Sequence, residues 1–149
     1  MKKEAAGKVL KLFLAEEGQK GRIAKRKIEV DEGGVCEDKH HGKDLHRSIL
    51  ITSTKSYAMT KENGIGIEHG ELGENILVDF NPYSLKVGTR LQVGKTVLEI
   101  SHGGMICAGL SKVHPKLPKL LKNARGIFAK VIEGGEISGG DDIYVLHSI

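Results

Sequence analysis

The chain has no tryptophan and only three phenylalanines and three tyrosines among its 149 residues. Proteins that hold nucleic acid usually stack bases on exposed aromatic side chains, so this shortage argues against such a partner. Only two cysteines are present, Cys36 and Cys107, which is too few for a disulfide scaffold and favours a reducing compartment. No apolar run approaches the length needed to cross a bilayer. These absences predict a soluble, cytoplasmic protein that binds neither nucleic acid nor membrane.

Acidic residues are missing from one long segment. Residues 108–131 contain six lysines and arginines and no Asp or Glu. The formal net charge of the chain is only +4, and most of the excess lies in this segment and in Lys20–Lys27. Concentrated positive charge attracts anions, and a moderate total suits a small anionic ligand better than a long polyanion. The length predicts a single domain, residues 1–149, with its own hydrophobic core.

Short apolar runs separated by glycine-containing turns dominate the sequence. We predict strands at Val9–Leu14, Ile28–Val30, Ser48–Ile51, Ile76–Val78, Thr89–Val93, Val97–Ile100, Ile127–Ile132 and Ile143–Leu146. Helices are expected at Thr52–Asn63, with Gly64 as the stop, and from Pro118 to about Ala124. This pattern favours a mainly β protein, a closed or partly closed β-barrel of short strands with two or more short helices, over alternating βαβ units.

A single cysteine stands among glycines in the segment Ile100–Leu110. Glycine permits close approaches that a side chain would forbid, so Cys107 can face a bulky ligand at the end of a strand. Free cysteine is also among the most buried residue types, and an inert buried thiol is the alternative. The cations that follow favour the thiolate, which is both the nucleophile and the metal-ligating form. Cys107 is therefore the candidate catalytic residue.

A histidine-rich loop, Asp38–Arg47, allows three interpretations. The first is a zinc site, although the spacing fits no standard structural zinc pattern. The second is a polar loop whose groups bond one another and the backbone. The third is a ligand-binding loop in which Arg47 offers a planar fork to an anion and Asp38 orients it or a neighbouring histidine. The zinc ligands available to the first interpretation are Cys36, His40, His41 and His46.

Two further segments carry polar residues next to predicted strands. Glu74 and Asn75 stand where a loop becomes a strand, where an asparagine can bond nearby backbone or help to shape a pocket. Arg125 precedes a glycine and a strand, which suits a surface charge or a clamp for phosphate or carboxylate. No GxxxxGK[ST] nucleotide loop is present.

Taken in order, these segments resemble the MOSC domain, named after the C-terminal domain of molybdenum cofactor sulfurase, and in particular its small stand-alone bacterial type. The resemblance covers about Gly7 to Val145. Its pieces are VCEDKHHGKDLHRSILI, GELGENILV, YSLKVGTRLQVGKTVLEIS, MICAGL and RGIFAKVIEGGEISGGDDI. Two departures are Cys36 and Glu37, where a glycine commonly precedes the aspartate, and Ile106, where a proline is common. Cys36 is either a second thiol near the site or a buried filler, and we expect the buried filler.

The resemblance implies a mainly β-barrel fold and binding of the molybdenum cofactor (molybdopterin), a metal held by the dithiolene sulfurs of a phosphorylated pyranopterin. Cys107 would ligate the metal, as a soft thiolate suits a sulfur-rich centre. The basic run after it would meet the phosphate. The cofactor-binding residues that this implies are Asp38, His40, His41, Arg47, Glu74, Asn75, Lys112 and Arg125.

Three functions are compatible with this resemblance. The first is a small reductase of N-hydroxylated compounds that receives electrons from a separate donor protein. The second is a sulfur carrier with a persulfide on Cys107, supplied by a sulfur donor protein. The third is a non-catalytic module that binds the cofactor. The sequence does not separate the reductase from the sulfur carrier, because both need an accessible, activated cysteine.

Overall fold

The computed structural model describes residues 2–19, 21–103, 108–122 and 124–147. These residues form eleven strands, three α-helices and one 3-10 helix. The strands are β1 (Lys2–Leu14), β2 (Ile23–Lys25), β3 (Lys27–Asp31), β4 (Gly34–Val35), β5 (Ile49–Ser53), β6 (Ile76–Val78), β7 (Arg90–Val93), β8 (Thr96–Gly103), β9 (Ile127–Glu133), β10 (Gly135–Ser138) and β11 (Asp142–His147). The helices are η1 (Leu45–Arg47), α1 (Thr54–Glu62), α2 (Ala108–Val113) and α3 (Leu117–Leu120).

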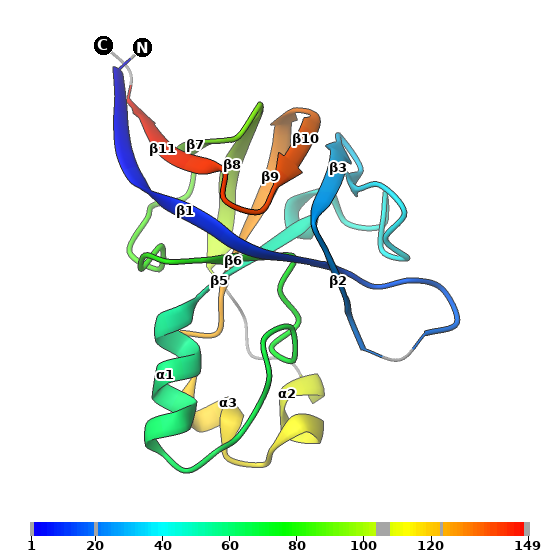
Figure 1. Ribbon diagram of the computed structural model, residues 1–149, viewed down its shortest axis with the longest axis vertical. Coiled ribbons are helices and arrows are strands. Elements are labelled where there is room, and N and C mark those ends of the chain that lie inside the picture. Colours follow the sequence, from blue (N-terminus) through cyan, green and yellow to red (C-terminus); the bar gives the residue numbers. More distant parts are fainter. Residues whose placement is uncertain (1, 20, 104–107, 123, 148–149) are drawn as a thin grey trace.

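Seven strands close into a barrel in the order β11-β7-β8-β9-β5-β6-β1, and β1 pairs again with β11 (Figure 1). Neighbouring barrel strands are antiparallel except β5 and β6, which are parallel. β1 is long enough to pair with β11 along its first half and with β6 and β2 along its second half. A smaller sheet, β10-β3-β4, lies beside the barrel. The predicted class, a mainly β closed barrel with short helices, is confirmed.

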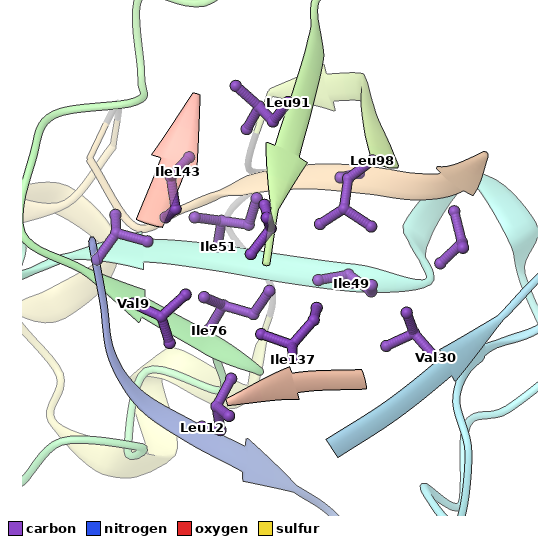
Figure 2. Packing of buried hydrophobic residues seen from close by; sticks show 14 of the residues in the cluster. Val9, Leu12, Val30, Ile49, Ile51, Ile76, Leu91, Leu98, Ile137 and Ile143 are labelled. Atoms are coloured by element: carbon purple, nitrogen blue, oxygen red, sulfur yellow. The ribbon is translucent and has the colours of Figure 1, made fainter. Parts of the chain in front are cut away.

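Apolar side chains from nearly every barrel strand fill the interior (Figure 2). They alternate with residues that point outwards, as the two-residue repeat of a strand requires. Val30 on β3 and Ile137 on β10 belong to the same cluster, so the small sheet covers part of the barrel interior. Side chains that are almost completely buried include Leu12, Ile49, Ile51, Ile76, Leu91, Leu98 and Ile100.

A second apolar cluster joins the barrel to the three α-helices, which gather on one side of it (Figure 1). Leu77 belongs to this cluster, whereas its neighbour Ile76 faces the barrel interior. The helix partners are Tyr57 of α1, Leu110 of α2 and Leu117 of α3. No helix in the described part of the chain combines the length and apolar character needed to span a membrane.

The sequence-based boundaries agree with most elements. β6 spans the predicted residues, and α1 begins after Ser53, whose side chain accepts a hydrogen bond from the Lys55 N–H at 3.1 Å. β10 was not predicted; it is short, with four residues that pair with β3, and it begins with Gly135. α2 was not predicted. The first half of β1 was also missed, since its exposed residues lack the apolar alternation of a half-buried strand.

Candidate functional site

A cavity of about 330 Å³ lies where β5, β9 and the histidine-rich loop meet. We call it the cationic cavity, because four of its lining side chains are basic and two are acidic. The basic residues are Arg22, Lys43, Arg47 and Arg125, and the acidic residues are Asp38 and Asp44. His40, Ser48, Leu50, Gly73, Asn75 and Phe128 complete the lining.

Two arginines approach the same glycine in the wall. Gly73 has a φ of +89°, a left-handed conformation that favours glycine. A Cβ at this position would lie 3.2 Å from Nη2 of Arg125 and 4.0 Å from Nε of Arg22. The Nε of Arg125 also donates a hydrogen bond to the Leu72 carbonyl at 3.2 Å. A side chain at Gly73 would therefore crowd the Arg125 guanidinium, while the Arg22 guanidinium lies beside the same turn.

Arg22 lies in an unusual electrostatic environment, with its side chain only 18% exposed. Burial lowers the pKa of its guanidinium most, and Arg125 lowers it further, while Asp38 and Glu74 raise it. The nearest Asp38 oxygen is 3.5 Å from Arg22 Nη1, which is a long contact. Two neighbouring cations at a partly buried surface favour an anion between or beside them.

Asp38 anchors the histidine-rich loop to the end of β1. Its Oδ2 accepts a hydrogen bond from the Ala15 N–H at 2.9 Å, and its Oδ1 accepts one from the His40 N–H at 2.8 Å. The His40 ring lies beside the same Oδ1, with Nδ1 at 3.0 Å. Burial raises the pKa of this carboxyl, but the two N–H groups and Arg22 lower it more, so its net pKa is below the ordinary value. Asp38 is therefore an anionic structural anchor that shapes the cavity.

Arg47 lines the cavity from η1. Asp44 caps this short helix by accepting a hydrogen bond from the His46 N–H at 3.1 Å. The Ser101 hydroxyl donates to the His46 carbonyl, which ties η1 to β8. The Arg47 guanidinium lies 5.8 Å from the centre of the Phe128 ring, within the range of a cation–π contact. Together Arg47 and Phe128 form a flat, partly apolar part of the wall.

Arg125 is positioned through its backbone. The Thr52 hydroxyl of β5 donates a hydrogen bond to the Arg125 carbonyl at 2.8 Å. The next residue, Gly126, packs so closely on β5 that a Cβ there would lie 2.6 Å from Leu50 Cδ1. The start of β9 is thereby fixed against β5, with Arg125 at the cavity.

Asn75 joins two strands beside the cavity. Its Oδ1 accepts a hydrogen bond from the Leu50 N–H at 3.0 Å, and its Nδ2 donates to the Phe13 carbonyl at 3.3 Å. This is the backbone-bonding role that the sequence offered as one of two interpretations, and the residue also lines the cavity.

Glu74 lies behind the wall and is fully buried. The Tyr57 hydroxyl contacts both carboxylate oxygens, at 2.8 and 2.6 Å, and the Gly70 N–H donates to Oε2 at 3.1 Å. Burial raises the pKa of Glu74, although these hydrogen bonds lower it in part. Glu74 therefore supports the turn that carries Gly73 and does not line the cavity.

The structure gathers five of the eight residues assigned to cofactor binding along this cavity: Asp38, His40, Arg47, Asn75 and Arg125. Lys112 is exposed on α2 and is not among the lining residues. His41 points elsewhere and contacts Asp31. Cys107 lies outside the described residues. The assignment of these residues to a cofactor stays a prediction.

Sequence reasoning missed Arg22, Lys43 and Phe128 as cavity residues. Arg22 lies in the basic stretch Lys20–Lys27, so a signal was present, but nothing in that stretch singled it out. Cys36 is partly exposed, and the expectation of a buried filler is wrong. Partial burial nonetheless raises the pKa of its thiol, and Asp31 raises it further.

The fold is similar to that of three solved structures. YuaD from Bacillus subtilis is 23% identical with a TM-score of 0.84, and the alignment covers 97% of each chain. YiiM from Geobacillus stearothermophilus is 14% identical with a TM-score of 0.67, covering 98% of this chain and 76% of that one. YiiM from Escherichia coli is 17% identical with a TM-score of 0.66, covering 93% and 70%.

A search of curated protein sequences gave no significant match. The sequence profile of the MOSC domain matches residues 37–144. This range contains all but one of the residues that line the cationic cavity, the exception being Arg22. Since the match covers well over half of its length, the chain belongs to the MOSC domain family.

Proposed function

We propose that the cationic cavity binds the phosphorylated pyranopterin of the molybdenum cofactor and that the protein is a small reductase of N-hydroxylated compounds. The observation that carries the proposal is the approach of Arg22 and Arg125 to Gly73 in a partly buried wall. Family membership supports the choice of cofactor.

The donor set of the cavity fits an anionic pterin. Both acidic side chains of the lining already accept backbone hydrogen bonds, Asp38 from two N–H groups and Asp44 from one. With four basic and two acidic side chains, the lining keeps an excess of positive charge, although Asp38 lies beside Arg22 and Asp44 beside Arg47. A phosphate monoester carries a charge of about −1.5 to −2 at pH 7 and presents three strong acceptor oxygens. The volume of about 330 Å³ is at the lower end of the range for small-molecule sites, which is roughly 300–1,000 Å³.

The lining residues divide into two roles in this proposal. Arg22 and Arg125 would hold the phosphate, because guanidinium forks match phosphate oxygens in pairs. Arg47 and Phe128 would contact the planar pterin with their flat faces. Asp38 keeps the loop in place and sets the position of His40.

The metal ligand in this proposal is Cys107. Along β8, His102 pairs with Phe128 and Gly103 with Ile127, so the described part of β8 ends beside the strand that carries Phe128. Cys107 follows four residues later in the sequence. When bound, the cofactor supplies the redox chemistry. The overall change is N–OH + 2e⁻ + 2H⁺ → N–H + H₂O, with electrons from a separate donor protein.

The test is to produce the protein in a host that synthesises the molybdenum cofactor and to measure molybdenum and pterin per polypeptide. We expect near-equal amounts of both, together with reduction of an aromatic N-hydroxylated compound when a reduced viologen dye is the electron donor. Cys107→Ser should abolish the reduction and leave the fold intact, as judged by circular dichroism. Cys36→Ser should affect reduction much less than Cys107→Ser.

Three results would contradict the proposal in different ways. A sulfur adduct on Cys107 without molybdenum would favour the sulfur carrier. Bound cofactor without reduction of any compound tested would favour a non-catalytic module. Unchanged reduction by Cys107→Ser would remove this residue from the mechanism.

A further inference from the structure

A second group of ligating side chains lies outside the cationic cavity. Asp31 ends β3, Cys36 follows β4, and His41 lies in the loop beyond it. One ligand atom from each lies within 4.8 Å of the other two. His41 Nε2 is 2.6 Å from Asp31 Oδ1, and Cys36 Sγ is 3.4 Å from Asp31 Oδ2. None of the three lines the cationic cavity.

The backbone around this group holds the imidazole in one place. The Gly33 N–H donates to Asp31 Oδ1 at 2.8 Å, and the Gly42 N–H donates to the Gly33 carbonyl at 2.8 Å. A Cβ at Gly33 would lie 2.6 Å from the His41 ring. The imidazole therefore lies directly over a bare glycine, and a larger residue would displace it.

The chemistry of the three groups selects the type of cation. A thiolate and an imidazole suit zinc, whereas Mg²⁺ and Ca²⁺ prefer oxygen ligands alone. Zinc bonds of about 2.0–2.3 Å in a tetrahedron place the ligand atoms roughly 3.5 Å apart, so small side-chain rotations are sufficient. A thiolate, a carboxylate and a neutral imidazole also balance the two positive charges of the metal. The fourth position is available to water.

We propose that Asp31, Cys36 and His41 bind a zinc ion. Of the residues considered from the sequence, the fold brings together Cys36 and His41, adds Asp31, and leaves His40 against Asp38. On binding, the Cys36 thiol loses its proton to solvent and its sulfur forms the bond to zinc. The segment between the two ligands, Cys36 and His41, contains Asp38 and His40, so the metal would secure the loop that forms one wall of the cationic cavity.

Cobalt titration tests this proposal directly. The parent is the full chain with Cys107→Ser, so that Cys36 is its only thiol, freed of metal with a chelator and kept reduced. We expect a thiolate-to-cobalt absorption band in the near ultraviolet that saturates at one Co²⁺ per chain and is lost when Zn²⁺ is added. Cys36→Ser should remove the band.

Two further variants test the geometry. His41→Gln should weaken Co²⁺ binding by at least about 100-fold, because even partners outside the ligand shell contribute 10- to 100-fold. Gly33→Ala should also weaken it, through displacement of the His41 ring. His147→Ala, on β11, is the matched control and should bind as the parent does. Circular dichroism checks that each variant is folded.

Zinc should also raise the thermal unfolding temperature of the parent and not that of Cys36→Ser. The proposal is overturned if the parent shows no thiolate-to-cobalt band, or if Cys36→Ser binds as tightly as the parent. It is likewise overturned if folded His41→Gln keeps the parent's affinity. Because no pterin takes part in these measurements, they are independent of the function proposed for the cationic cavity.

Discussion

Replacing Tyr57 by phenylalanine should destabilise the turn that carries Gly73. The Tyr57 hydroxyl donates to the buried Glu74 carboxylate and accepts hydrogen bonds from the N–H groups of Gly70, at 2.9 Å, and Leu72, at 3.3 Å. A hydrogen bond to a charged group contributes about 1.5–3 kcal/mol, and a buried N–H left without an acceptor costs about 1–3 kcal/mol. In the variant the Gly70 N–H still donates to Glu74, and the hydrogen bond lost by the Leu72 N–H is a long one. We therefore expect the free energy of unfolding to fall by about 2–4 kcal/mol in total.

The size of this loss should depend on pH. Burial raises the pKa of Glu74, and the Tyr57 hydroxyl partly opposes that rise. A carboxyl whose folded pKa is raised contributes most to stability below its unfolded pKa, and that contribution is lost as pH rises through the folded pKa. Tyr57→Phe removes the opposing hydrogen bond and raises the folded pKa further. The difference in unfolding free energy between the variant and the wild type should therefore widen between about pH 4 and pH 7.

Urea unfolding at both pH values measures this difference. Tyr144→Phe on the barrel is the matched control and should change stability by less than about 0.5 kcal/mol. The double variant with Glu74→Gln gives the coupling energy between the two side chains, which we expect to be about 0.5–3 kcal/mol. A loss for Tyr57→Phe below about 0.5 kcal/mol at pH 7, or one that is equal at both pH values, would refute the reasoning.

Two other substitutions test the cavity wall. Gly73→Ala and Gly88→Ala both place a side chain at a φ near +90°, but only the Cβ at Gly73 has a neighbour within 4 Å. Gly73→Ala alone should therefore weaken the binding of phosphate, measured by calorimetry. Equal phosphate binding by both variants would contradict the contact with Arg125. Asn75→Ala should lower the free energy of unfolding, measured in urea, by about 2–4 kcal/mol, because it removes the side-chain partners of the Leu50 N–H and the Phe13 carbonyl. A loss below about 1 kcal/mol would show that these two backbone groups find other hydrogen-bond partners.

Local patterns predicted the barrel strands well, because alternation of apolar residues depends only on near neighbours. Ile76 and Leu77 illustrate this, since one faces the barrel interior and the other the helices. The cavity depended on contacts between distant segments. Arg22 and Arg125 both lie near Gly73 because the fold brings three separate segments together at the cavity, and no local pattern carries that information. The pairing of Glu74 with Tyr57 was hidden for the same reason.

Local sequence patterns also did not predict the contacts within the histidine-rich loop, although these residues are close together in the sequence. Asp38 bonds the backbone, as the interpretation as a polar loop expects, and Arg47 lines the cavity, where the binding of a ligand stays a prediction. Spacing alone did not select His41 over His40 as the partner of Cys36. The fold makes that choice, because the His41 ring lies over Gly33 and beside Asp31, whereas the His40 ring lies beside Asp38.

The proposed role of Arg22 and Arg125 is to hold the phosphate of a pterin cofactor. Its most direct test is the amount of pterin retained per polypeptide by the wild type, by the double variant Arg22→Gln/Arg125→Gln, and by Arg26→Gln, an exposed arginine outside the cavity. We predict retention near one per chain in the wild type and in Arg26→Gln, and a decrease of at least about tenfold in the double variant, since each fork to phosphate is a charge-assisted contact. Equal retention by all three proteins would contradict the claim.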